Sequence, residues 1–223
     1  MTNRLPYPTR PIEVDVLGRA FRILEVADAE ALLDELIDRE SQEEGPLDDL
    51  IPYWAELWPS ALGMAQYLLK EQVIRYGETV LELGCGLGLP GIVAGTMGGI
   101  VTLSDHLPPA LDFARENWIL NLPEQPVQLS LLDWRHPDSS LAADCLLASD
   151  ITYDVSNFPY LPQAFRQLIR PGGRVILADP KRAVAQDFFS NLPKEGFDVE
   201  KLQEIVAFNN KMIQIDIYEL QLV

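Results

Sequence analysis

The sequence predicts an α/β domain with a mostly parallel sheet over residues 52–223. An N-terminal accessory extension, residues 1–51, is expected to hold a hairpin and an acidic helix. Between residues 79 and 178, short apolar runs alternate with segments of helical periodicity, as in strands joined by crossover helices. The run Cys145–Ala148 is apolar without a break, which suits a central strand buried on both faces. A glycine-rich stretch follows the first strand, where open α/β sheets bind ligands.

The composition fits one globular domain and argues against several classes of protein. The chain has 223 residues, of which 48% are hydrophobic, enough for a sizeable core. No stretch approaches the roughly 20 apolar residues of a membrane span, and the first residues lack the apolar run of a secretory signal. Two cysteines, Cys85 and Cys145, make neither a disulfide framework nor a metal-ligand spacing. We expect a cytoplasmic protein with no membrane association and no metal.

The net charge of the chain indicates which classes of partner it could bind. The formal net charge is −17, and Lys and Arg are nowhere concentrated as a phosphate-binding surface requires. Nucleic acid is therefore not an expected partner. A lysine-bearing protein surface would be attracted by the negative field, although acidity that only maintains solubility is an equally common explanation. The sequence does not indicate the oligomeric state.

The N-terminal extension begins with alternating apolar and polar residues. Over residues 12–24 this alternation, centred on Leu17-Gly18, predicts a β-hairpin. Helical spacing follows, with Asp28 suited to the N-cap. Gly45-Pro46 is expected to end this helix.

An aromatic segment precedes the first long helix of the domain. Trp54 and Trp58 stand four residues apart, and Pro59 suits the first turn of a helix that runs to about Lys70. Taken alone, such an aromatic pair is more often packing than a ligand platform.

The glycine-rich stretch follows a strand over residues 79–83. Gly84, Gly86 and Gly88 alternate, and an apolar helical run comes next. Glycines at this density let the backbone take positive φ and approach a ligand closely, and the following helix N-terminus suits an anionic or polar group. The dinucleotide fingerprint would need a third glycine where Leu89 stands, so it fails. From the loop alone, a connector without a ligand stays open.

The remaining elements alternate regularly. Expected strands cover residues 100–104, 127–131, 142–149, 174–178, 197–200 and 211–222, and expected helices cover about 110–120, 161–169 and 184–192. Pro171-Gly172-Gly173 is expected to end the second of these helices.

Acids stand where three of these strands end. Asp105 ends the second strand, 21 residues after Gly84, where a carboxylate can accept hydrogen bonds from ribose hydroxyls or cap the next helix. Asp133-Trp134 follows the third strand; this acid or its backbone could read an adenine amino group while the aromatic ring contacts the base. Asp150 follows the fourth strand.

The pattern Glu82-x-Gly84-x-Gly86-x-Gly88 resembles motif I of class I S-adenosylmethionine (SAM) methyltransferases. That resemblance implies a Rossmann-like seven-stranded sheet of order 3-2-1-4-5-7-6 with the last strand antiparallel, and SAM as the cofactor. The residues that it implies for cofactor binding are Trp58, Glu82, Gly84, Cys85, Gly86, Gly88, Asp105, His106, Asp133, Trp134 and Ser149.

Within that class, the chain is similar to family 16, which consists largely of protein lysine methyltransferases. Trp58 stands 24 residues before Glu82, and Asp150-Ile-Thr-Tyr153 matches the family's Asp/Glu-x-x-Tyr/Phe motif. The segments Tyr53-Trp54-Ala55 and Ala178–Arg182 are similar to the branch that methylates electron-transfer flavoprotein β-subunit. Ile151-Thr152 replaces the two prolines typical of enzymes that methylate adenine or glutamine amino groups.

The resemblance implies methyl transfer from SAM to a lysine of a protein substrate. Asp150 and Tyr153 are the expected catalytic residues, and Trp54 and Tyr153 are expected on the substrate side. The attacking amine must be neutral, and a nearby carboxylate raises the pKa of an amine. Asp150 is therefore expected to orient the lysine amine or the cofactor's amino group rather than to activate the lysine by its charge. The alternatives are a small-molecule N- or O-methyltransferase and a SAM-binding interaction module without catalysis.

Overall fold

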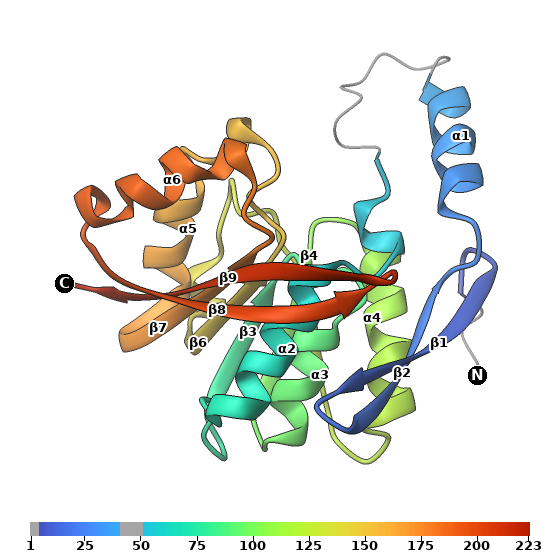
Figure 1. Cartoon of the computed structure of the whole chain (residues 1–223), viewed down its shortest axis with the longest axis horizontal. Helices are drawn as coiled ribbons and strands as arrows, with labels where there is room; N and C mark the ends of the chain where they lie inside the picture. Colours follow the sequence, from blue (N-terminus) through green and yellow to red (C-terminus); the bar gives the residue numbers. More distant parts are fainter. Residues whose placement is uncertain (1–4, 41–50) are drawn as a thin grey trace.

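The computed structural model describes residues 5–40 and 51–223, and a seven-stranded sheet forms its centre (Figure 1). In chain order these strands are β3 (Thr79–Leu83), β4 (Ile100–Asp105), β5 (Gln128–Leu131), β6 (Ala143–Ser149), β7 (Ile169–Asp179), β8 (Phe197–Phe208) and β9 (Lys211–Leu222). Across the sheet the order is β5-β4-β3-β6-β7-β9-β8. The first five strands run parallel, and β9 is antiparallel to both of its neighbours. The predicted order and the antiparallel last strand are confirmed.

Helices cover both faces of the sheet. The α-helices of the domain are α2 (Pro59–Glu71), α3 (Leu89–Thr96), α4 (Pro108–Asn121), α5 (Leu161–Leu168) and α6 (Gln186–Asn191). The first four carry a proline in their first two positions, where its missing N–H costs nothing and its fixed φ favours the helix. Short 3-10 turns are formed by Tyr53–Ala55, Ser139–Leu141, Val155–Asn157, Ala183–Ala185 and Leu192–Glu195.

The two faces of the sheet build two separate apolar clusters. Strand residues alternate between them, so Val80 packs with α2, α3 and α4, while Leu81 packs with α5 and α6. Both side chains are almost completely buried. Because the central strands are covered on both sides, only their ends remain free to meet a ligand.

The N-terminal hairpin is formed by β1 (Thr9–Val16) and β2 (Arg19–Val26), as predicted. Leu17 and Gly18 make its turn, both with positive φ (53° and 81°). After it, α1 (Ala29–Glu40) begins at Asp28, whose Oδ1 accepts the Ala31 N–H at 2.9 Å and so confirms the predicted cap. The expected helix stop at Gly45-Pro46 lies outside the described residues.

The hairpin is fastened to α4 by the side-chain amides of Asn117 and Asn121, and Asn121 exchanges hydrogen bonds with the backbone of Arg22. Asn117 of α4 is fully buried; its Oδ1 accepts the Leu24 N–H at 2.6 Å, and its Nδ2 donates to the Leu24 carbonyl at 3.1 Å. The same Nδ2 donates to the carbonyl of Leu87 at 3.0 Å. A strand of the extension and the glycine-rich loop therefore share a single side-chain partner.

Two strands differ from their predicted bounds by more than one residue. β7 begins at Ile169, five residues before the predicted start, because Ile169 pairs with Ala143 and a bulge then takes up Pro171-Gly172-Gly173 before Arg174 pairs with Cys145. The preceding helix accordingly ends at Leu168. β8 continues to Phe208 because its pairing with β9 continues, although its sequence is too polar to give an apolar signal.

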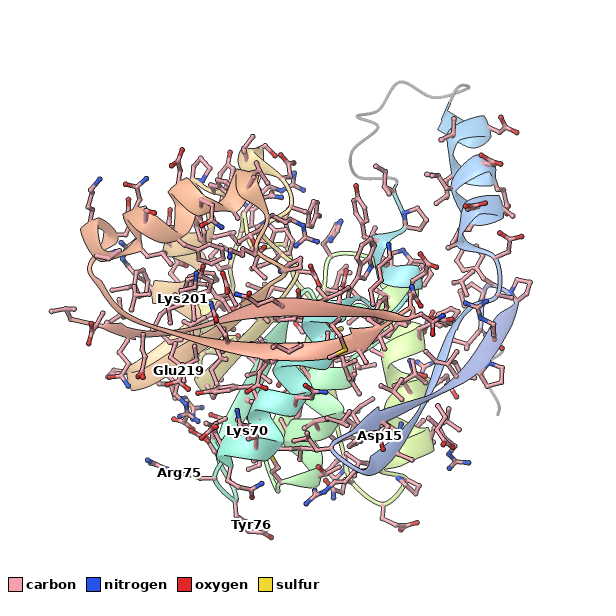
Figure 2. The ribbon with its side chains drawn as sticks, in the orientation of Figure 1. Asp15, Lys70, Arg75, Tyr76, Lys201 and Glu219 are labelled. Atoms are coloured by element: carbon pink, nitrogen blue, oxygen red, sulfur yellow. The ribbon has the colours of Figure 1, made fainter. Side chains whose placement is uncertain are left out.

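The strand ends define two edges of the sheet. Figure 2 shows Arg75 and Tyr76 at the amino-terminal edge, in the loop between α2 and β3. The carboxyl ends of the parallel strands lie at the opposite edge. Across the part of the chain that the structure describes, no helix is long and apolar enough to cross a membrane.

Candidate active site

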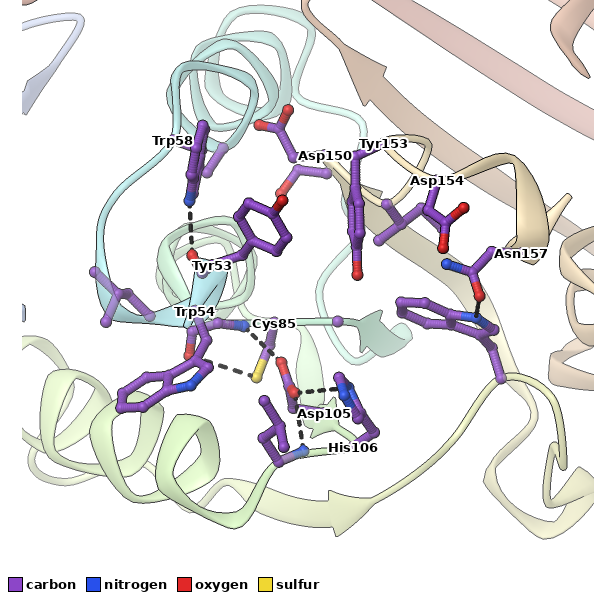
Figure 3. Close-up of a pocket in the computed structure, with 18 of the residues that line it drawn as sticks. Tyr53, Trp54, Trp58, Cys85, Asp105, His106, Asp150, Tyr153, Asp154 and Asn157 are labelled. Atoms are coloured by element: carbon purple, nitrogen blue, oxygen red, sulfur yellow. Dashed lines mark hydrogen bonds and ion pairs between the residues drawn. The ribbon is translucent and has the colours of Figure 1, made fainter. Parts of the chain in front are cut away.

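A cavity of about 290 Å³ opens at the carboxyl edge of the sheet (Figure 3). Every site residue predicted from the sequence lines it, with the exception of Glu82. The predicted residues in its wall are Trp54, Trp58, Gly84, Cys85, Gly86, Gly88, Asp105, His106, Asp133, Trp134, Ser149, Asp150 and Tyr153. Within residues 5–40 and 51–223, no group of three His, Cys, Asp or Glu side chains is arranged to hold a metal ion.

The floor of the cavity is bare backbone. Gly84, Gly86 and Gly88 all have left-handed φ, at 65°, 49° and 81°. Glycine adopts this conformation without the steric penalty of a Cβ. A Cβ on Gly84 would also lie 3.1 Å from Ile151 and 3.2 Å from Trp134, in space that the loop keeps clear.

Glu82 lies beneath the loop and is not among the residues that line the cavity; its contact with the cofactor stays a prediction. Its Oε2 accepts the Gly91 N–H at 2.9 Å, and its Oε1 has no hydrogen-bond partner among the described residues. Burial raises the pKa of this carboxyl to about 8; Asp105 adds to the rise, and the Gly91 N–H opposes it. The side chain joins the end of β3 to the first turn of α3, and so fixes both ends of the loop.

Asp105 connects the glycine loop to the start of α4. Its Oδ2 accepts the Gly86 N–H at 3.0 Å, and its Oδ1 accepts the N–H of Leu107, the N-cap residue of α4, at 3.1 Å. The His106 Nδ1 lies 3.5 Å from the same Oδ1. Asp105 also lines the cavity. Its bond to Leu107 precedes the first turn of α4, which has no side-chain cap, and its ribose role stays a prediction.

Asp133 and Trp134 line the same side of the cavity as His106. Asp133 is paired with Arg135, with 2.9 Å between Oδ2 and Nε. The Trp134 Nε1 donates to the Asn157 Oδ1 at 3.2 Å, and the His106 ring lies 6.1 Å from the indole. Arg135 and Asn157 were not predicted; both line the cavity from loops that follow strand ends.

Aromatic rings form another part of the wall. The ring centroids of Tyr53 and Tyr153 are 4.9 Å apart, and Trp58 lies 5.9 Å from Tyr53 and donates its Nε1 to the Tyr53 carbonyl at 2.6 Å. Figure 3 shows the two tyrosine side chains next to each other, close to Asp150. The Trp54 indole instead packs 5.3 Å from Phe113, in the core. Tyr53, which was not predicted, lines the cavity beside Tyr153, and Trp54 lines it as well.

Asp150 directly follows β6, at a sharp turn of the backbone. Its φ is 59°, unusual for a residue with a Cβ, and its N–H donates to the Ala178 carbonyl at 3.0 Å. Its Oδ2 accepts the Ser60 N–H at 3.2 Å, and its Oδ1 lies 2.6 Å from the Arg182 Nη1. Burial raises the pKa of Asp150, and the Arg182 guanidinium opposes that rise.

Arg182 also lines the cavity and is the main functional residue that the sequence did not single out by itself. The segment Ala178–Arg182 supplied only a branch similarity. The turn after β7 brings the guanidinium back over Asp150, 3.3 Å from the Asp179 Oδ2. Sequence spacing does not reveal such a pair, because the two residues lie on different loops.

The arrangement combines a glycine floor, an acid at the end of β4 and an aromatic passage beside a second acid. A polar, nucleoside-sized ligand would meet donors and acceptors along the floor. A second molecule could reach it past Tyr53 and Tyr153.

Comparison with known proteins bears on what this site does. A family model described as lysine methyltransferase matches residues 53–195. EEF1A lysine methyltransferase 3 from Mus musculus is 32% identical over 169 residues, which make up 74% of this chain and 70% of that protein. Histone-arginine methyltransferase METTL23 from Rattus norvegicus is 36% identical over 115 residues, or 48% of this chain and 50% of that protein.

A solved structure shares the fold. Magnesium protoporphyrin IX methyltransferase from Synechocystis PCC 6803, solved with bound SAM, aligns with a TM-score of 0.56 at 16% identity. The alignment covers 87% of this chain and 98% of that one. Because the sheet order, the glycine floor and the family match all agree, this chain belongs to the lysine methyltransferase family and is an enzyme that takes its methyl group from SAM.

Proposed function

We propose that this enzyme methylates a lysine side chain of a protein substrate. The observation that carries the proposal is the pair of rings of Tyr53 and Tyr153, 4.9 Å apart, beside Asp150. A lysine has a long apolar stem and a terminal amine, which suits a narrow aromatic passage with a polar end. The description of the family and the name of the mouse relative point to the same side chain.

The residues of the cavity fit the cofactor. We assign Gly84, Gly86 and Gly88 to its methionine part, because their bare backbone lets a ligand approach closely. Asp105 is assigned to the ribose; its carboxylate has about four acceptor positions, and the Gly86 and Leu107 N–H groups use two.

The other predicted residues take neighbouring roles in the same proposal. Asp133 and Trp134 are assigned to the adenine, and Trp58, Cys85, His106 and Ser149 to the surrounding wall. Glu82 is assigned to support of the loop from beneath. When bound, the cofactor supplies a methyl group made electrophilic by a sulfonium.

The chain's own residues must deliver a neutral amine. A free lysine has a pKa near ~10.4 and carries no lone pair when protonated. Tyr53 and Tyr153 shield the amine from water, which favours its neutral form. Asp150 accepts a hydrogen bond from the remaining N–H and so orients the lone pair toward the methyl carbon.

The proposal is tested with radiolabelled SAM and a lysate as the source of protein substrates. We expect label in protein, recovered as methyl-lysine after hydrolysis, and no label with a folded Asp150→Ala variant. Label recovered as methyl-arginine would contradict the lysine assignment and match the residue named for the METTL23 relative. Label only in small molecules, or SAM binding without transfer to any acceptor, would contradict the protein substrate.

A further inference from the structure

We propose that Arg182 is a positioning residue for Asp150: it fixes the orientation of that carboxylate and offsets its negative charge, so that an entering amine is less strongly held as an ammonium. The inference rests on the proposed function and deepens it. The Arg182 side chain is 23% exposed, lines the cavity and places Nη1 2.6 Å from the Asp150 Oδ1.

The turn that follows β7 aims Arg182 at Asp150. The Asp179 Oδ1 accepts the Arg182 backbone N–H at 2.7 Å, and Lys181 between them takes a left-handed φ of 63° that reverses the chain. The Asp179 Oδ2 accepts the Thr152 hydroxyl at 2.6 Å and lies 3.3 Å from the Arg182 Nη1. Asp179 is 1% exposed, so the anchor of the guanidinium is buried while its tip reaches the cavity.

Asp150 is held from its other side by α2. The Ser60 N–H donates to Oδ2 at 3.2 Å from the first helical turn, which carries no acidic residue. An exposed N–H at a helix N-terminus favours a negative charge. Each carboxylate oxygen of Asp150 therefore faces its own positive group. The negative charge of Asp179 acts in the opposite sense and raises the pKa of Asp150.

The groups around Asp150 determine whether an incoming amine is stabilised in its neutral or its protonated form. A bare carboxylate beside the amine would stabilise the ammonium form and slow transfer. With Arg182 in place, the carboxylate keeps an acceptor lone pair for orientation, and the guanidinium, which Asp150 shares with Asp179, offsets part of its negative charge. Without Arg182, both Asp150 and Asp179 would lose their guanidinium partner, and a protonated lysine would take its place.

The test compares Arg182→Met with Lys181→Met. The control removes the same charge one residue away, from an exposed side chain that does not line the cavity, and keeps a non-glycine residue at the left-handed position. We measure kcat and KM between pH 7 and 10 on the protein that the radiolabel assay identifies as the substrate. For Arg182→Met we expect kcat at pH 7.5 to fall about tenfold, the midpoint of the kcat profile to rise by about one pH unit, and the loss to recover at high pH, with no increase in KM.

Lys181→Met is expected to follow the wild type. If Arg182 only supported the fold, the fractional loss of kcat in Arg182→Met would be the same at every pH. That result would overturn the proposal. The proposal would also be overturned if calorimetry showed that Arg182→Met binds S-adenosylhomocysteine more than about tenfold more weakly than the wild type, because Arg182 would then be a cofactor residue.

A second readout uses the protein without cofactor or substrate. In Arg182→Met, the unpaired Asp150 carboxylate is harder to ionise in the folded state, so its folded pKa rises further above the unfolded value. The stability deficit relative to the wild type must then grow as the pH rises through the folded pKa values of Asp150 in the two proteins and be constant above them, and Asp150→Asn in the same chain must remove that growth. A deficit independent of pH would refute the pairing. Failure to find methyl-lysine with the wild type would refute the proposed substrate and leave this measurement unaffected.

Discussion

Replacing Asp105 by alanine tests the assignment of the ribose site and of the loop anchor together. Asp105 is 5% exposed, and its side chain accepts two backbone hydrogen bonds, from Gly86 at 3.0 Å and from Leu107 at 3.1 Å. Alanine removes both acceptors and the charge. Asparagine keeps the size and one acceptor oxygen, so it separates loss of charge from loss of shape.

The expected magnitude follows from the hydrogen bonds that alanine cannot accept. A hydrogen bond to a charged acceptor contributes about 1.5–3 kcal/mol, and a buried donor left unpaired costs about 1–3 kcal/mol. If one ribose hydroxyl bonds the carboxylate, its loss weakens binding by about 10- to 150-fold, at 1.4 kcal/mol for each factor of ten. The unpaired Gly86 N–H adds to this by loosening the floor of the cavity.

The assay is calorimetric titration with S-adenosylhomocysteine. The expected order of affinity is wild type, Asp105→Asn, then Asp105→Ala. Asp112→Ala is the matched control, because Asp112 lies on α4, the helix that follows Asp105, pairs with Arg115 at 3.2 Å and does not line the cavity. Wild-type affinity in a folded Asp105→Ala variant would show that the ligand makes no use of this acid.

Three further substitutions test other parts of the site. Asp150→Ala should reduce methyl transfer by ~10²-fold or more, since the amine loses its orienting acceptor, while the circular dichroism spectrum is unchanged; full activity would remove Asp150 from the site. The Glu82 carboxyl, with a pKa raised to about 8 from 4.5, makes the wild type lose stability as the pH rises between these values, and Glu82→Gln should lack that loss in thermal melts; identical pH dependence would contradict the raised pKa. Gly91→Ala places a Cβ 2.3 Å from Leu103 and 2.6 Å from Glu82, so it should cost about 1–3 kcal/mol in urea unfolding; an unchanged midpoint would mean that the loop relaxes freely.

Residues at strand ends could be placed from the sequence because parallel strands bring their carboxyl ends to one edge. Gly84, Asp105, Asp133 and Asp150 each follow a strand with a clear apolar signal, and all four line the cavity. The order of the sheet needed the family resemblance, since an alternating pattern alone fits several strand orders.

Two contacts in the site depend on local backbone conformations that the spacing of residues in the sequence does not predict. In the 3-10 turn Tyr53–Ala55, adjacent side chains point in different directions, so Tyr53 faces Tyr153 while Trp54 enters the core. Arg182 reaches Asp150 only because Lys181 adopts a left-handed backbone, a conformation that lysine rarely takes. Neither contact follows a helical or strand period.

The amide of Asn117 has a consequence for hydrogen exchange. It bonds both Leu24 of the hairpin and Leu87 of the glycine loop, so local opening of the hairpin removes two of the three hydrogen bonds that hold this amide beside the loop. If the loop opens together with the hairpin, a ligand that binds only the closed loop slows exchange of the Leu24 amide proton, by up to about 100-fold at a ligand concentration 100 times Kd. A strand that lies outside the cavity thus becomes a reporter of whether the cavity is filled.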